Sequence, residues 1–226
     1  MSNLISEYIK RSSSIIKENR ERSLFNRITI YIKDPFTENI DLNFVIKKIE
    51  NIIPVELVSS VDSIMVGQFK HLNDRDVNAA YLEGAIYLTN VQDDEEDMID
   101  DIVHEMAHAV EERMEIQIYS DNEIEREFLG KRSRLAALLK AESHDIPANL
   151  EFEADYDQRI DQYLYQEVGY PVLTSLTMGL FYSPYAATSL REYFANGFEA
   201  VFLHNDGRYL KKISPVLFSK LENLTE

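Results

Sequence analysis

A five-residue motif, His104-Glu105-Met106-Ala107-His108, constrains the fold of this chain more than any other segment. Apolar residues recur around it at the spacing of an α-helix: Met98, Ile99, Ile102, Val103, Ala109 and Val110. Because this apolar stripe is wide, we expect a helix that is buried on most sides. Residues four positions apart lie on one face of a helix, so the two imidazoles can share one metal ion.

The same motif predicts a zinc site with a general base beside it. Two histidine nitrogens can each bind Zn²⁺ at about 2.0–2.1 Å, and Glu105 can then reach a metal-bound water. The chain contains no cysteine, which excludes disulfides and thiolate zinc ligands. A pair of histidines that bind nothing is the alternative, but the buried helical setting favours a metal site with Zn²⁺ as cofactor.

Charge and composition narrow the classes of partner. The chain has 226 residues, which suits one domain, and its 40 acidic and 23 basic residues give a net charge of −17. This balance argues against nucleic acid and against an anionic membrane surface as partners. The region Met1 to Arg22 lacks the apolar segment of a signal peptide, and no stretch is apolar enough to span a membrane. We therefore expect a cytoplasmic location in the producing cell; signal-independent export and association with a virion stay open.

The pattern of apolar residues predicts strands first and helices afterwards, an α+β fold with segregated layers. We expect a helix over about 3–22, and another from Asp41 to about Asn51. Strands are predicted at 27–33, 61–66 and 85–89, and helices at 95–115, 121–142, 148–167, 189–204 and 214–224. An edge strand directly before the metal helix can hold an extended peptide, and we expect residues 85–89 in that role.

The third protein ligand of the zinc is open at this point. A catalytic zinc usually has three protein ligands, and His71, His144 and His204 stand outside the recognised spacings. A glutamate from a later helix is the expected alternative. Two segments supply one: the stretch 183–198, which contains Glu192, and the stretch 151–155, which contains Glu151 and Asp155.

The stretch 183–198 resembles the catalytic domain of anthrax lethal factor and the clostridial Pro-Pro endopeptidases. In that family HExxH is followed well downstream by a tyrosine and, seven residues later, by a glutamate in a Glu-aromatic-Phe-Ala-x-x-Phe pattern. Tyr185 and Glu192 have this spacing, and Glu192-Tyr193-Phe194-Ala195-Asn196-Gly197-Phe198 fits the pattern. The tail from Ser214 to Leu221 also resembles the family's closing helix. Together the similar parts cover roughly residues 84–112 and 183–222.

The resemblance implies a zincin-like fold in a single domain, residues 1–226. Its parts would be an N-terminal α/β part (about 1–83), the strand and metal helix (84–112), a helical insertion (113–182), and the third-ligand and closing helices (183–226). It implies a gluzincin-type zinc metalloendopeptidase that acts on a protein or peptide substrate. The insertion would shape the substrate cleft or bind a protein partner.

The resemblance also implies a role for each site residue. His104, His108 and Glu192 would bind zinc, Glu105 would activate the water, and Tyr185 would donate a hydrogen bond to the developing oxyanion or leaving group. General chemistry agrees with this assignment. A phenol hydroxyl can stabilise a tetrahedral intermediate, and a carboxylate among apolar neighbours is costly unless it is paired or bound to a metal.

Two alternatives stay open. The spacing of Glu151 and Asp155 resembles the Glu-x-x-x-Asp motif of CAAX-type membrane metalloproteases, although this chain lacks their membrane spans. The second alternative is a zinc-binding structural or interaction protein, an assembly or effector component with little or no peptidase activity. The acidic composition, the unassigned N-terminal part and the long insertion motivate that second hypothesis.

Overall fold

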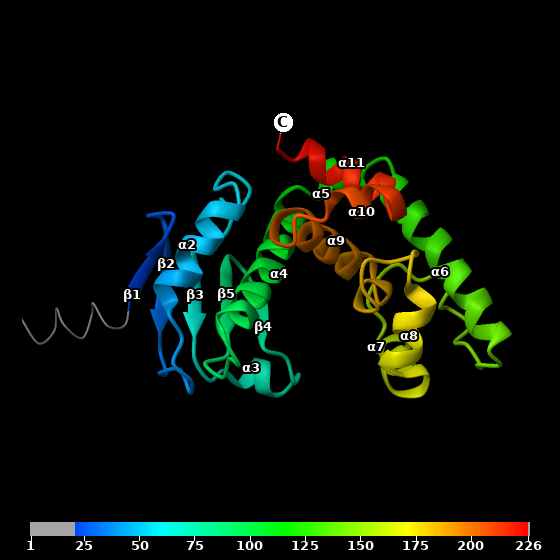
Figure 1. Cartoon of the computed structure of the whole chain (residues 1–226), viewed down its shortest axis with the longest axis horizontal. Helices are drawn as coiled ribbons and strands as arrows, with labels where there is room; N and C mark the ends of the chain where they lie inside the picture. Colours follow the sequence, from blue (N-terminus) through cyan, green and yellow to red (C-terminus); the bar gives the residue numbers. More distant parts are fainter. Residues whose placement is uncertain (1–20, 226) are drawn as a thin grey trace, which may run out of the picture. The chain divides into compact units, whose positions relative to one another are not determined.

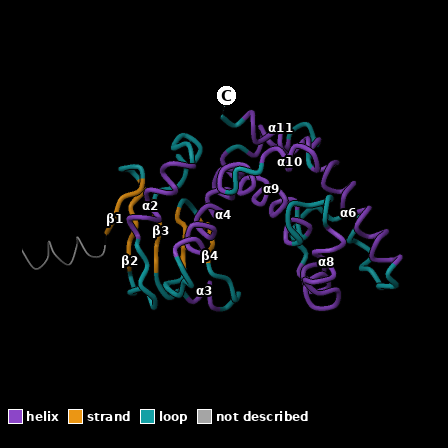
Figure 2. The backbone as a smooth tube through the Cα atoms, viewed as in Figure 1, coloured by secondary structure: helices purple, strands orange, loops and turns teal. Residues whose placement is uncertain are grey.

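The computed structural model describes residues 21–225 and consists of two compact units, Met1–Ala109 and Val110–Glu226. We describe each unit by itself. The first unit, called unit 1 below, contains a β-sheet and helices, and the second, unit 2, is built from helices (Figures 1 and 2). The α+β class predicted from the sequence is therefore confirmed, with the strands in the N-terminal part and helices after it.

Unit 1 has a five-stranded mixed sheet in the order β1-β2-β3-β5-β4. Its strands are β1 (Glu21–Leu24), β2 (Ile28–Ile32), β3 (Ser63–Val66), β4 (Ala79–Leu82) and β5 (Ala85–Leu88). Strands β2, β3 and β5 run parallel to one another, and the two edge strands, β1 and β4, are antiparallel to their neighbours.

One face of this sheet is apolar and buried, because alternate residues of each strand point to the same side. Helix α2 (Leu42–Ile52) adds apolar residues to the core, and helix α4 (Glu95–Arg113) adds more. Asp41 begins α2 as expected, since its carboxylate accepts hydrogen bonds from the backbone N–H groups of Asn43 and Phe44 at 3.0 and 3.2 Å. The fully buried core residues of the parallel strands and of α4 include Ile28, Ile64, Val66, Ile86, Leu88, Met98, Ile99, Ile102 and Val103.

Strands β4 and β5 form a hairpin whose two-residue turn requires a glycine. Glu83 and Gly84 both have positive φ, +47° and +84°, as a tight hairpin turn requires. A Cβ atom on Gly84 would also lie 3.0 Å from Oδ2 of Asp62. The turn places β4, not β5, at the edge of the sheet. The prediction that residues 85–89 form the peptide-binding edge is therefore wrong, because β5 pairs with β3 on one side and β4 on the other.

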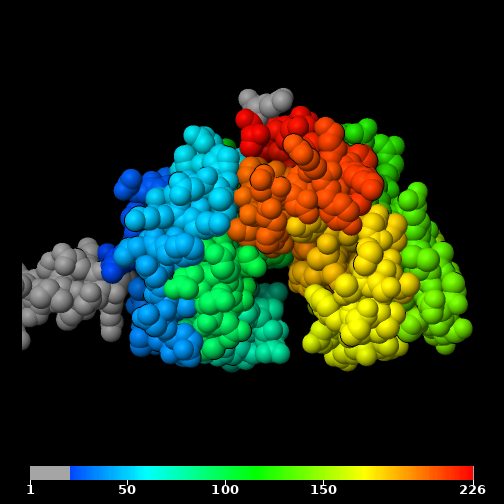
Figure 3. All heavy atoms as spheres, in the orientation of Figure 1, coloured from blue at the N-terminus to red at the C-terminus, as the bar shows by residue number. Residues whose placement is uncertain are grey.

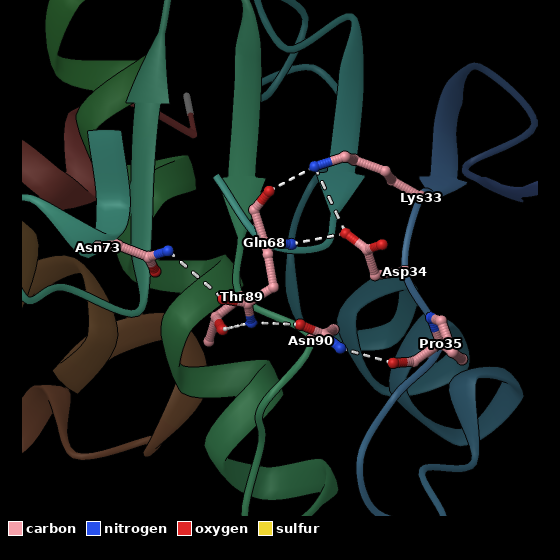
Figure 4. Close-up of polar contacts among 7 residues, drawn as sticks. All are labelled: Lys33, Asp34, Pro35, Gln68, Asn73, Thr89 and Asn90. Atoms are coloured by element: carbon pink, nitrogen blue, oxygen red, sulfur yellow. Dashed lines mark hydrogen bonds and ion pairs between the residues drawn. The ribbon is translucent and has the colours of Figure 1, made fainter. Parts of the chain in front are cut away.

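Polar side chains link the loops that follow the three parallel strands (Figure 4). After β3, the Gln68 backbone N–H donates to Asp34 at 2.9 Å, and its side-chain amide donates to Asn90 Oδ1 at 2.5 Å. Asn90 donates in turn to the carbonyl of Pro35 at 2.6 Å. Because Asn90 stands a few residues before α4, these bonds fix where the chain enters that helix.

Helix α4 begins in unit 1, and its last residues belong to unit 2. The rest of unit 2 is α5 (Glu115–Tyr119), α6 (Glu123–Ala141), α7 (Gln158–Gln162), the π-helix η1 (Tyr163–Gly169), α8 (Tyr170–Thr177), the 3₁₀ turn η2 (Tyr185–Ala187), α9 (Leu190–Phe198), the π-helix η3 (Glu199–Leu203), α10 (Gly207–Ile213) and α11 (Pro215–Asn223). Within residues 21–225, no helix combines the length and apolar character needed to cross a membrane.

Most predicted elements are present, with clear exceptions. The strands at 27–33, 61–66 and 85–89 are confirmed, as are the helices that start near 41, 95, 121, 189 and 214. The helix predicted for 148–167 is wrong in its first half, because helical structure begins only at Gln158. The helix predicted over about 3–22 falls largely outside the described residues, and its end, Glu21 and Arg22, lies in β1. Strands β1 and β4, helices α8 and α10, and the short helix α3 (Lys70–Asn73) were not predicted.

Candidate metal centre

Helix α4 brings the motif residues together as the sequence predicts. The rings of His104 and His108 lie 4.8 Å apart between centroids with their planes at 87°. Each of His104, Glu105 and His108 offers a possible ligand atom, and these atoms lie within 4.8 Å of one another. These three residues could hold a metal ion, and they are the only such group found in the described part of the chain.

The site lies on a helix face that is mostly withdrawn from water. Glu105 is 8% exposed and His108 is 5% exposed, while Met106 and Ala107 between them are fully buried. Imidazole and carboxylate groups are costly to bury without partners. Two adjacent imidazoles on a buried face therefore suit a shared ligand better than they suit a packing role.

Glu105 is anchored to the edge strand. Its Oε2 atom accepts a hydrogen bond from the backbone N–H of Tyr81 in β4 at 2.6 Å. In an antiparallel pair, alternate residues bond to the partner strand and the others point away from it. Asn78 bonds to Thr89 at 2.8 Å, so Ala79 and Tyr81 direct their backbone groups away from β5. Glu105 therefore meets β4 on its outer side, a contact that the sequence analysis missed because it did not predict β4.

One turn before His104, α4 carries a second buried acid. Burial raises the pKa of Asp101 to about 7, against the opposing effect of its hydrogen bond from Gln92. Gln92 Nε2 lies 3.2 Å from Asp101 Oδ2, and the charges of Asp97 and Glu105 raise the pKa further, while His104 lowers it. Asp101 thus adds negative charge near His104, as the outer partners of metal-binding histidines often do.

Tyr185 and Glu192 lie on one segment of unit 2. Tyr185 begins the short turn η2 and is 40% exposed. Ser189 begins helix α9, and its hydroxyl accepts the backbone N–H of Glu192 at 3.2 Å. Glu192 is half-buried in the first turn of α9. The Ser-x-x-Glu spacing is also that of a capping box, so helix capping alone can account for a glutamate at this position.

A buried arginine on α6 holds this segment in place. Arg132 is fully buried, and its Nη1 donates to the carbonyls of Ala187 at 2.6 Å and Thr188 at 3.1 Å. Its Nε donates to the carbonyl of Leu150 at 2.9 Å. Burial lowers the pKa of Arg132 to about 10, so the guanidinium remains charged at neutral pH. The turn that carries Tyr185 is therefore positioned by a side chain that is distant in sequence.

Glu111, on the last turn of α4, lies close to Glu192 within unit 2. Burial raises the pKa of Glu111 to about 7, although its hydrogen bond from Tyr119 and the charge of Arg191 oppose the rise, and Glu192 adds to it. The Arg191 Nε atom lies 3.8 Å from Glu111 Oε2. Sequence analysis missed Glu111 and Tyr119, because neither belongs to a motif.

The competing segment loses its structural basis. The spacing of Glu151 and Asp155 brings two carboxylates to one face only on a helix, and these residues are not helical. The Glu151 carboxylate instead accepts hydrogen bonds from Lys140 at 2.8 Å and from the Ser133 hydroxyl at 3.0 Å. This carboxylate therefore has a role in a surface ion pair of unit 2.

Comparison of the chain with family models, curated proteins and solved structures finds no match. The relationship to lethal factor and the Pro-Pro endopeptidases stays a prediction, and so does the zincin-like fold. The structure brings together His104, Glu105 and His108 within unit 1 and places Tyr185 and Glu192 on one segment of unit 2. The joining of these two groups in one site is likewise a prediction.

Proposed function

We propose that this protein is a zinc-dependent endopeptidase. The observation that carries the proposal is the pairing of His104 and His108 on α4 beside a glutamate that is anchored to the edge strand. Two imidazoles with a carboxylate from a later segment, and no thiolate, are a donor set of catalytic zinc sites. Glu192 is our candidate for that third ligand, supported by its spacing from Tyr185.

Each site residue would have a defined task. A zinc ion bound here would polarise the scissile carbonyl and lower the pKa of a bound water. Glu105 would take the proton of the attacking water and deliver it to the leaving amine. The N–H of Tyr81 donates to this carboxylate, and such donation favours the ionised form that a general base needs. Tyr185 would donate its phenol proton in a hydrogen bond to the developing oxyanion.

Strand β4 supports a polypeptide as substrate. It has only one neighbour in the sheet, β5, and Ala79 and Tyr81 direct their backbone groups to the outer side. An extended peptide can add to such an edge as a further strand. Glu105 bonds to the same side of β4, so a peptide paired there would pass close to the general base.

The substitution Glu105→Gln tests the proposal. We expect the purified wild-type protein and the variant each to hold one zinc per chain, measured by elemental analysis. The wild type should cleave members of a peptide library, and the variant should be at least about 100-fold slower. A wild-type protein without zinc, or a variant as fast as the wild type, would overturn the proposal. Zinc in both proteins, cleavage by neither and stable capture of a partner would instead establish the zinc-binding interaction protein.

The third ligand has its own test. We expect Glu192→Gln to weaken zinc binding by about 100-fold or more, because about 10–16 kcal/mol of zinc affinity is shared among a few ligands. Glu151→Gln is the matched control and should leave zinc affinity unchanged. Competition with a chromogenic chelator measures both. The reverse result would move the assignment from Glu192 to Glu151.

A further inference from the structure

Three exposed tyrosines surround one carboxylate in unit 2, in a part of the molecule that the proposed chemistry does not use. Tyr156, Tyr165 and Tyr170 are 58%, 62% and 46% exposed, and Asp161 lies among them. We call these four residues the tyrosine cluster. Three of them belong to the segment α7-η1-α8, which is labelled in Figure 1 and forms part of the surface drawn in yellow in Figure 3.

Direct contacts connect the members of the cluster. The Tyr156 hydroxyl donates a hydrogen bond to Asp161 Oδ2 at 3.0 Å. The rings of Tyr165 and Tyr170 meet edge to face, with 6.0 Å between centroids and 81° between planes. Asp161 and Tyr165 are also close enough to Tyr170 to add to the rise in its pKa that burial causes. The three rings therefore share one carboxylate.

The backbone of the cluster is regular and shaped for this contact. Asp161 lies on α7, and Tyr165 follows one turn later in the π-helix η1. Gly169 then adopts φ +82°, a conformation that L side chains rarely take, and α8 begins at Tyr170 with Pro171 in its first turn. π-Helical turns are rare and occur often at functional sites. The tyrosines are thus presented by helices and not by a loop tip.

The surroundings carry an excess of negative charge. Between Asp145 and Met178 the chain has seven acidic residues and one basic residue, Arg159. That arginine lies 2.9 Å from Asp157 in an ion pair, so six of the seven acids are uncompensated within the segment. A cation that approaches the cluster is therefore attracted by charge before it meets the rings.

We propose that the tyrosine cluster binds a lysine or arginine side chain from a basic segment of a partner protein. The face of an aromatic ring attracts a cation, and Asp161 provides the opposite charge beside three such rings. Exposed rings that are already packed against one another lose little conformational freedom on binding. The site is independent of the metal centre, so it binds its partner whether or not the chain is a peptidase.

A short peptide with two arginines separated by glycines and labelled with fluorescein is the probe. The full-length protein carries Glu105→Gln, which prevents cleavage, and fluorescence anisotropy measures the affinity. Tyr165→Ala and Tyr170→Ala should each weaken binding about two- to fivefold, the range expected for an exposed cation–π contact. Tyr31→Ala, an exposed tyrosine of unit 1 (39%), is the matched control and should change nothing. None of these substitutions alters the net charge, so general attraction to an acidic protein stays constant.

Several results would overturn the proposal. They are equal affinity in the wild type and both ring variants, equal weakening by Tyr31→Ala, or equal binding of a peptide with citrulline in place of arginine. Circular dichroism checks that each variant is folded. If a ring variant does not fold, Asp161→Asn replaces it, since the side chain keeps its shape and loses its charge. Unchanged arginine-peptide affinity in that variant would then reject the site.

Discussion

The two regions that carry the candidate site residues are positioned in different ways. In unit 1, His104, Glu105 and His108 come from consecutive turns of one helix, and their spacing follows from helix geometry alone. In unit 2, the turn that carries Tyr185 is fixed by Arg132, whose guanidinium bonds to Ala187, 55 positions away in the sequence. A local motif thus supplies one group and long-range packing the other.

This difference bears on how each region responds to substitution. A ligand residue on α4 can be replaced without loss of the backbone that presents its neighbours. The turn before Glu192 instead depends on a few side chains of α6, among them Lys131, which donates to the carbonyls of Leu180 and Ile213 and to the Ser214 hydroxyl. We expect substitutions in α6 to affect stability, and substitutions of the motif to affect function.

The largest effect should come from Arg132→Met. Its loss leaves the carbonyls of Leu150, Ala187 and Thr188 buried without this donor, at about 1–3 kcal/mol for each unsatisfied group. We expect the free energy of unfolding to fall by about 3–5 kcal/mol in urea titrations. The exposed neighbour Arg134→Met is the control, with a change within about 0.5 kcal/mol. Equal effects of the two would remove the contrast between the regions.

His108→Ala should have a large effect on metal binding and a smaller one on the fold. Zinc affinity should fall by about 2.5–4 kcal/mol, one ligand's share of a typical zinc site. Isothermal titration calorimetry measures the affinity. The exposed His204→Ala should leave it unchanged. A variant that loses its α4 helix on removal of this imidazole would show that the motif is not locally encoded.

The pH dependence of stability tests the buried lysine of α6. Burial lowers the pKa of Lys131 to about 8 from an ordinary value of 10.5, so the unfolded chain binds this proton more tightly than the folded one. Stability therefore rises as the pH increases from 8 to about 10.5. Relative to Lys131→Met, the wild type should gain up to about 3 kcal/mol over that range. Urea titrations at pH 7.5, 8.5 and 9.5 measure the gap, and a constant gap would contradict the shift.

The smallest effects should come from helix caps, one in each unit. Asp41→Ala and Ser189→Ala each remove a side chain that caps a helix, so each should lower the free energy of unfolding by about 1 kcal/mol. If Glu192 is a zinc ligand, only Ser189→Ala should also weaken zinc binding, because it loosens the first turn of α9. Zinc affinity that is insensitive to both would count against Glu192.

The sequence predicted those parts of the molecule that depend on short-range patterns. The α+β class, strands β2, β3 and β5, helix α4 and the grouping of His104 with His108 follow from periodicity and spacing. Strand β4 could not be predicted in the same way, because Ala-Ala-Tyr-Leu carries little strand preference and owes its place to the hairpin with β5. The bond from Tyr81 to Glu105 and the role of Arg132 depend on packing that no local pattern encodes.

The tight turn between β4 and β5 offers a way to recognise distant ancestry. Gly84 needs a positive φ, and its neighbour Asp62 leaves little room for a side chain. A homologue whose overall similarity has decayed would retain a glycine there, twenty positions before the first histidine of the motif. A search of genomes that weights this glycine together with the two histidines and the glutamate would find relatives by the few residues that geometry does not allow to drift.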